Sequence, residues 1–312
     1  MKNIYNILIT TFITFTLSAC SSDSDSFDPY IHQSKRPFYP TTITFSNLNN
    51  DGTQTDKKWE LSYNDNKSIK SYNYNYNVKT NNGVEMKEEH SGELTYYKDP
   101  ATGNNVIQNI LTINSNVTSL ATAESYNDKI TEYVELSSIG TIQKITTLGQ
   151  RTYSNGEKEA YSNTRTFTYT DKFCTSSTLI DNNGTTTYSY NWNNGKINSI
   201  AKYQQDNSNN VTQEENIYTY DNNDFATDYE FNTMAFIYGN MPEIYAAMNL
   251  LGATTAYKIE SENYSGYRNF TGTSKPIAPI NRSYAILETT NSVTYTADSQ
   301  SSNTYIFTFS NN

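Results

Sequence analysis

One acidic segment of the chain places carboxylates beside an imidazole, the pairing that metal binding and acid–base chemistry use. It contains Glu85, Glu88, Glu89, His90 and Glu93. On a strand, side chains two positions apart point the same way, so Glu88 and His90 share a face and would supply two ligands of a metal site. The same residues also suit an exposed edge strand that is kept soluble by its charge, and this second interpretation is favoured.

A second acidic segment carries Asp221, Asn223, Asp224 and Asp228, a spacing similar to that of a calcium-binding loop. The glycine of the sharp turn and the closing bidentate glutamate are missing at the required positions. A turn between two strands is therefore the favoured interpretation. The sequence predicts no metal and no other cofactor.

Catalytic chemistry has little material in this chain. It has two histidines and two cysteines, and neither Gly-x-Ser-x-Gly nor His-Glu-x-x-His occurs. Cys174 has no histidine near it in sequence, so we expect a small buried hydrophobe rather than a nucleophile. The sequence therefore favours a protein that is not an enzyme. With 32 Asp and Glu residues, a pair of carboxylates that cleaves glycosidic bonds stays open as the alternative.

The N-terminus has the pattern of a lipoprotein signal. Lys2 precedes an apolar stretch over residues 4–17, which is shorter than the roughly 20 apolar residues that span a bilayer but fits a secretion signal. Leu17-Ser18-Ala19-Cys20 follows and resembles a bacterial lipobox. The pattern predicts a signal peptide over residues 1–19 and lipidation of the Cys20 thiol, whose acyl chains anchor the protein in the outer membrane.

Residues 20–40 are expected to form a flexible tether after the lipidated Cys20. The tether begins with Ser21-Ser22-Asp23-Ser24-Asp25-Ser26, a charged and Ser-rich run that cannot bury itself. A run of this kind directly after the lipidated cysteine resembles the signal for surface export in Bacteroidetes lipoproteins. That resemblance implies a domain facing the cell exterior, and a periplasm-facing tether of the same composition is the alternative.

Composition restricts the class of partner. The 312 residues include 22 Lys and Arg against 32 Asp and Glu, which gives a net charge of −10 and a pI near 4.8. Such a chain is unsuited to the phosphate backbone of nucleic acids. Aromatic residues make up 14%, with 28 tyrosines, so a folded core built largely from aromatic rings is expected.

From residue 41 onward, extended runs alternate with turn clusters. Aromatic and apolar residues recur with period two, as at Trp59, Leu61 and Tyr63 and at Tyr72, Tyr74 and Tyr76. Asn-Gly reversals between such runs predict antiparallel hairpins, at residues 81–83, 154–156, 181–184 and 193–195. We predict an all-β fold, a single domain over 41–312 that forms an antiparallel up-and-down meander, either a curled sheet or a soluble barrel.

The two faces of these strands differ in polarity. In Tyr72-Asn-Tyr74-Asn-Tyr76-Asn, one face is aromatic and the other, wet face is polar and suited to contact with water. A lipid-facing barrel wall needs an outward apolar band, so the aromatic side is expected to face a dry interior and the wet side to face water. Trp59 and Trp192 are expected to point into this core.

A weak repeat marks successive hairpins: an aromatic, a polar residue, an aromatic, a polar turn, and then an apolar residue. Copies end their aromatic pair at Tyr169, Trp192 and Tyr220, with a related unit at Trp59 to Ile69. One such hairpin cannot bury its own aromatic face, so its neighbours must pack beside it.

One segment breaks the strand pattern. Asn240 is a candidate N-cap, Pro242 follows near the first turn, and Gly252 is a stop signal. A helical stripe is formed by Ile244, Ala247, Met248 and Leu251. A short helix near 242–251 is predicted to lay this face on the sheet, packed on or plugging its concave side.

The unit Tyr-x-Tyr-x-Trp-x-Asn-Gly-Lys-Ile at 188–197 resembles the tyrosine-rich repeat of bacterial YD-type proteins. The whole arrangement resembles an uncharacterised family of Bacteroidales surface lipoproteins that is described as having a porin-like fold. The resemblance covers about residues 41–312 and carries no activity. The expected function is that of an outer-membrane-anchored, surface-exposed, non-catalytic binding module for a glycan or a protein.

Overall fold

A computed structural model describes residues 39–48, 52–80, 83, 85–118, 125–171, 173–193, 196–220, 243–248, 250–251, 259–270, 273–288, 292–298 and 302–309. The predicted signal peptide, Cys20, most of the tether and the Asp221 to Asp228 cluster lie outside these residues. Asn240, Pro242 and Gly252 lie outside them as well. All structural statements below concern the described part of the chain.

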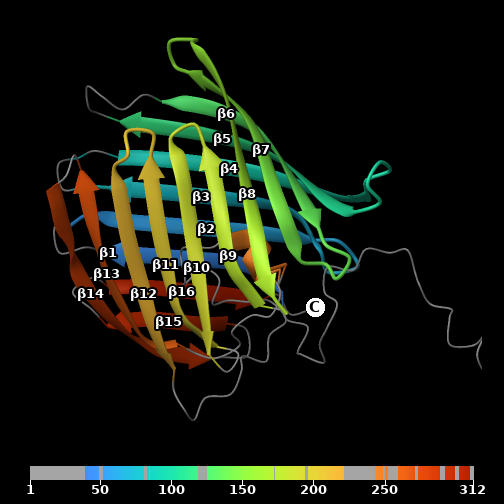
Figure 1. Cartoon of the computed structure of the whole chain (residues 1–312). Helices are drawn as coiled ribbons and strands as arrows, with labels where there is room; N and C mark the ends of the chain where they lie inside the picture. The colour runs from blue at the N-terminus through green and yellow to red at the C-terminus, as the bar shows by residue number, and fades with distance from the viewer. Residues whose placement is uncertain are drawn as a thin grey trace, which may run out of the picture.

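The described residues form a closed antiparallel barrel in which each strand pairs with its neighbours in sequence (Figure 1). The barrel closes where the first strand pairs with the last, with Ile43 opposite Phe307. The strands are β1 (Pro40–Leu48), β2 (Gln54–Tyr63), β3 (Ile69–Lys79), β4 (Glu85–Lys98), β5 (Asn105–Thr118), β6 (Tyr126–Leu136), β7 (Ile142–Tyr153), β8 (Lys158–Thr170), β9 (Phe173–Asp181), β10 (Gly184–Asn193), β11 (Lys196–Asp206), β12 (Val211–Tyr220), β13 (Ile259–Phe270), β14 (Thr273–Glu288), β15 (Ser292–Asp298) and β16 (Ser302–Phe309). The predicted all-β meander is confirmed, in its barrel form.

The aromatic faces point inward, as the alternation predicts. On β3, Tyr72 is buried, whereas Asn73 and Asn75 on the opposite face are exposed. Trp59 and Trp192 both pack against the buried core. The wet face therefore forms the outside of the wall. Separately, within the described residues no helix has the length and hydropathy to cross a bilayer.

A series of five side-chain hydrogen bonds at one end of the barrel explains the sequence repeat. Near the end of an even-numbered strand, an aromatic side chain donates to a backbone carbonyl at the start of the strand before it. The pairs are Tyr63 Oη to Pro40 O at 2.7 Å, Tyr96 Oη to Ile69 O at 2.7 Å, Tyr169 Oη to Ile142 O at 2.7 Å, Trp192 Nε1 to Cys174 O at 2.7 Å and Tyr220 Oη to Ile197 O at 2.6 Å. We call this end of the barrel the bonded rim and the opposite end the distal rim.

The second aromatic of each repeat copy is thus a hydrogen-bond donor at the bonded rim. Beside four of these donors the strand register shifts by a residue, at Tyr63, Tyr169, Trp192 and Tyr220. Such irregularities bend and twist a strand, so each repeat both turns the chain and ties the turn to the neighbouring strand.

Loss of one rim bond should be measurable. Tyr169→Phe leaves the carbonyl of Ile142 without its donor, so we expect it to lower the free energy of unfolding by about 1–3 kcal/mol. Tyr203→Phe, on an outward-facing ring that is 41% exposed, should change the free energy of unfolding by no more than about 0.5 kcal/mol. Urea unfolding measures both variants. Equal effects at the two positions would refute a structural role for the rim bonds.

The helix α3 (Glu243–Ala247) lies inside the barrel, where it plugs the concave side as predicted (Figure 1). It is shorter than the predicted 242–251 helix, although Met248 N still donates to Ile244 O. The expectation of a single buried face is wrong. The predicted stripe is buried, and so are Tyr245, Ala246 and Leu250, because the barrel wall surrounds the segment.

The interior is graded in polarity from one rim to the other. Towards the bonded rim it is apolar, with Ile107, Val134, Leu136 and Ile142 fully buried. The plug joins this core through its own backbone, since Ile142 N donates to Leu250 O at 2.8 Å. Charged and aromatic side chains instead line the inner wall towards the distal rim.

Candidate functional site

The inner wall near the distal rim carries a continuous band of polar and aromatic residues. Strand register places them in two adjacent rows across β2 to β8. One row is Lys57, Tyr76, Glu88, Ser115, Tyr126 and Tyr153, and the other is Trp59, Tyr74, His90, Ile113, Asp128, Arg151 and Glu159. We call these residues the polar band.

A buried ion pair lies at the centre of the band. Arg151 Nε and Nη2 donate to Asp128 Oδ1 and Oδ2, each at 2.9 Å. The Asp128 side chain is 2% exposed and that of Arg151 31% exposed. Hydrogen bonding to Asp128 raises the pKa of Arg151, so the guanidinium stays charged and holds the buried carboxylate in place.

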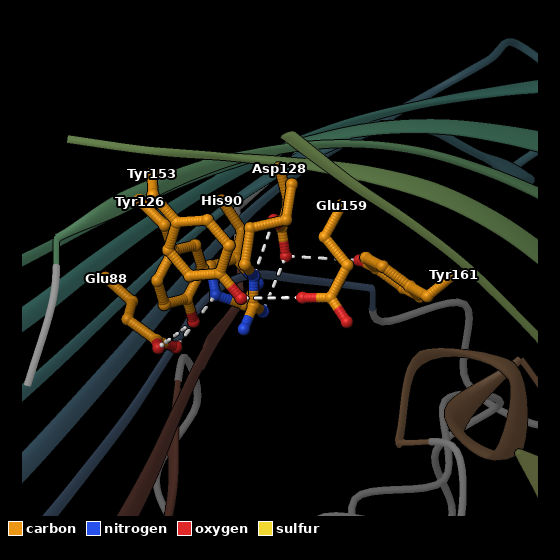
Figure 2. Close-up of polar contacts among 8 residues, drawn as sticks. Glu88, His90, Tyr126, Asp128, Tyr153, Glu159 and Tyr161 are labelled. Carbon is orange, nitrogen blue, oxygen red and sulfur yellow. Dashed lines mark hydrogen bonds and ion pairs between the residues drawn. The ribbon is translucent and has the colours of Figure 1, made fainter. Parts of the chain in front are cut away.

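Tyrosines complete this arrangement (Figure 2). Tyr161 Oη donates to Asp128 Oδ2 at 3.1 Å, and the Arg151 guanidinium lies 3.7 Å from the centre of the Tyr126 ring. The Tyr161 ring fills the space over Gly149, where a Cβ atom would come within 2.2 Å of it. A side chain at position 149 would therefore push the Tyr161 ring out of this place.

Glu88 and His90 form the second cluster of the band. His90 Nε2 lies 3.3 Å from Glu88 Oε2, and Tyr126 Oη donates to Glu88 Oε1 at 2.9 Å. The hydrogen bond with His90, and then the one from Tyr126, lowers the pKa of Glu88. Burial, and then Glu88, raises the pKa of Tyr126 to about 12. Glu88 is thus held as a carboxylate by two hydrogen-bonding partners.

The exposed edge strand expected for Glu88 and His90 is wrong. Their strand β4 pairs with β3 and β5 in the closed wall, and both side chains point inward, 18% and 17% exposed. Glu88 and His90 lie on the same face of the strand as the buried Gly92 and Leu94. Sequence reasoning missed this shared face. Among the described residues, no group of three or more His, Cys, Asp and Glu side chains is arranged to hold a metal.

An aromatic strip occupies the β2 to β4 side of the band. The Trp59 and Tyr74 ring centroids lie 4.1 Å apart with planes 30° apart, and Tyr76 stacks on Tyr74 at 6.4 Å and 14°. His90 meets Tyr74 edge-on at 4.7 Å. All four residues are half-buried, so they pack against the wall and keep some exposed surface.

The plug is attached to the wall just below this strip. Tyr245 Oη donates to Glu132 Oε2 at 2.6 Å, and Asn109 Nδ2 donates to the same oxygen at 2.9 Å. Asn109 also reaches Tyr72 Oη at 3.0 Å. Sequence reasoning missed Asp128 and Glu132 as interior groups, although they share the parity of the buried Ile130 and Val134 on β6.

The first residue of the plug belongs to the same side of the barrel. Glu243 Oε1 lies 4.0 Å from Lys57 Nζ, with side chains 23% and 32% exposed. Burial raises the pKa of Glu243, and Lys57 opposes the shift. Burial, and then Glu243, raises the pKa of the Tyr74 hydroxyl, and Glu88 adds to the shift.

Cys174 is buried, as predicted, and is the free cysteine among the described residues. Burial is the main cause that raises the pKa of its thiol to about 12. A thiol with so little thiolate at neutral pH is a poor nucleophile.

The burial of the interior tyrosines leads us to expect that the folded protein loses stability in alkali as these residues ionise. Burial raises the pKa of Tyr126 to about 12 and, as the leading cause, also raises the pKa of Tyr72, Tyr74, Tyr96, Tyr161, Tyr169 and Tyr245. A tyrosine whose pKa is higher in the folded chain than in the unfolded chain stabilises the folded state at pH values below the unfolded pKa of about 10. This stabilisation is lost as the pH rises from about 10 to about 12.

We therefore expect the share of the tyrosinate absorbance at 295 nm that comes from these interior residues to appear late, together with loss of β structure above pH 10. The chain unfolded in urea should instead titrate near pH 10 in one step. Full, reversible ionisation near pH 10 with the barrel intact would show that the rings are not buried.

Comparisons with known proteins support the fold alone. No family model matches the chain, and no curated protein sequence matches it. A porin-like protein from Bacteroides vulgatus has a similar structure, with 12% identity, a TM-score of 0.54 and coverage of 88% of this chain and 99% of that chain. A porin-like protein from Bacteroides uniformis, also 12% identical, has a TM-score of 0.47 and coverage of 87% and 96%. The similarity to the Bacteroides vulgatus protein confirms a porin-like fold, and no function follows from it.

Proposed function

We propose that this protein is a lipid-anchored outer-membrane lipoprotein whose barrel stands in water at the cell exterior and binds a ligand at the polar band without catalysis. The observation that carries the proposal is the graded interior. Apolar side chains and the plug are buried in the interior towards the bonded rim, whereas Lys57, Glu88, His90 and Arg151 near the distal rim keep exposed surface. Recognition sites combine aromatic walls with a few such polar groups.

The outer wall supports a barrel outside the bilayer. Lipid-facing strands need an apolar band about 25 Å tall, but the outward residues Asn73, Asn75, Glu89, Ser91 and Glu93 are polar and exposed. Exposed apolar side chains do occur on this wall, as at positions 110 and 148, but Thr131 lies between them in register. This supports the proposal that the protein meets the membrane through lipid on Cys20.

The position of the tether fits binding from the exterior. The chain enters β1 at Pro40, one residue before the expected domain boundary, and this end of β1 lies at the bonded rim. The polar band lies towards the other end. A ligand arriving at the distal rim would meet the band without passing the anchor, and the acidic chain argues for a glycan or a protein rather than nucleic acid.

Membrane attachment and orientation are tested in whole cells. Labelled palmitate should enter the wild-type protein and not Cys20→Ala, and protease added to intact cells should digest the barrel. Label retained by Cys20→Ala would refute lipidation at this residue. Protection from protease in intact cells, but not in lysed ones, would place the domain in the periplasm.

A carbohydrate-active enzyme is the second candidate. It is favoured by Glu88 and Glu243, because one carboxyl pKa is lowered and the other is raised beside the same aromatic strip. Glu243 would donate a proton and Glu88 would act as the ionised partner. Release of reducing sugar that Glu243→Gln abolishes would establish the enzyme, and binding without turnover would support the non-catalytic module.

A further inference from the structure

The aromatic strip of Trp59, Tyr74 and Tyr76 has the features of a stacking surface. The rings lie in sequence along β2 and β3, with planes 30° and 14° apart. Tyr72, one inward position below Tyr74 on β3, is 6% exposed, and the plug residue Tyr245 lies beside it, because Asn109 Nδ2 bonds both hydroxyls. The wall is thus filled at Tyr72 and partly exposed at Tyr74 and Tyr76.

Polar groups of both kinds border the strip. Glu88 lies next to Tyr76 in register and offers acceptors, and Lys57 lies on its other side and offers donors. Glu243 faces Lys57 from the plug at 4.0 Å. Such a mixture suits a ligand rich in hydroxyl groups, which donate and accept in turn. A purely apolar ligand would leave these charged groups desolvated, and Lys57 disfavours a cation.

We propose that the strip binds a neutral carbohydrate. The C–H face of a sugar ring would lie on the Trp59, Tyr74 and Tyr76 rings, and the sugar hydroxyls would bond to Glu88, Lys57 and Glu243. This inference rests on the proposed binding function and assigns its ligand class and its place on the band. The Arg151 and Asp128 pair, whose groups already bond each other, maintains the wall beside the strip.

The test uses the full-length protein purified from membranes and an array of neutral plant and microbial oligosaccharides. A hit is measured by calorimetry against wild type, Tyr76→Ala and the matched outward-facing variant Tyr203→Ala. We expect Tyr76→Ala to weaken binding about tenfold, because it removes the aromatic surface that the sugar ring would cover. Tyr203→Ala should change the affinity less than twofold.

A spectroscopic arm reports on the strip itself. The chain has two tryptophans, so Trp192→Phe leaves Trp59 as the one indole. Addition of the bound oligosaccharide should shift or quench its emission, and Tyr76→Ala should reduce that change at a fixed sugar concentration.

The outcomes separate this inference from the proposed function. An array with no hit, or a hit whose affinity is the same in Tyr76→Ala, overturns the carbohydrate strip. The binding function survives that result if a displayed peptide library yields a ligand whose affinity falls in Arg151→Gln or Tyr126→Phe. It fails if neither library yields a ligand that depends on any residue of the band.

Discussion

Replacing Arg151 with methionine should lower the free energy of unfolding by about 3–5 kcal/mol. The substitution leaves the Asp128 carboxylate, 2% exposed, without the guanidinium that donates two hydrogen bonds to it. An unpaired buried charge costs more than the ion pair contributes on its own. Urea unfolding, followed by circular dichroism, gives the difference.

Two control variants identify the cause of the loss. Lys144→Met breaks the ion pair with Glu135, whose groups are 41% and 36% exposed, and should cost no more than about 1 kcal/mol. Adding Asp128→Leu to Arg151→Met should recover part of the loss, because the buried charge is then gone. If Arg151→Met is as mild as Lys144→Met, the band does not contain a buried ion pair.

Replacing Tyr245 with alanine should have a similarly large effect, about 3–5 kcal/mol, because it empties the space of a fully enclosed ring. The residue is 5% exposed and its hydroxyl bonds Glu132 at 2.6 Å. Tyr245→Phe removes only this hydroxyl and should cost about 1–3 kcal/mol. The difference between the two variants measures the packing of the plug.

Tyr267→Ala is the matched control, since its ring faces outward and is 39% exposed. It should cost about 1 kcal/mol or less. Tyr245→Ala should therefore lower the free energy of unfolding clearly more than Tyr267→Ala does. If the two variants lowered the free energy of unfolding equally, the plug would not be held in the barrel.

Much of the fold could be predicted from local pattern. Period-two tyrosines and Asn-Gly reversals predicted the meander, and the stripe at 244–251 predicted a plug. The choice between a curled sheet and a closed barrel could not be made from local pattern, because β1 and β16 pair across most of the chain, with Thr41 Oγ1 3.5 Å from Thr308 O at a separation of 267 residues. The same closure buries all sides of the plug, which a one-faced stripe does not indicate.

The candidate site was predicted less well than the fold. Acidic residues at Glu88, Asp128 and Glu132 read as solvent-facing when taken one strand at a time, because isolated carboxylates are rarely buried. Their partners come from other strands: Tyr126 for Glu88, Arg151 for Asp128 and the plug residue Tyr245 for Glu132. Only strand register brings these groups together, and a single sequence specifies register weakly where both faces contain polar residues.

The central claim is that the outer wall faces water and that the protein meets the membrane through lipid at Cys20. Flotation with vesicles of outer-membrane lipids tests it most directly, using the lipidated protein and a purified chain of residues 21–312, with dye release measured alongside. The lipidated protein should float with the vesicles, and the 21–312 chain should stay in the dense fraction and release no dye. Flotation of the 21–312 chain in a protease-resistant, dye-releasing form would show a membrane-inserted pore and contradict the account.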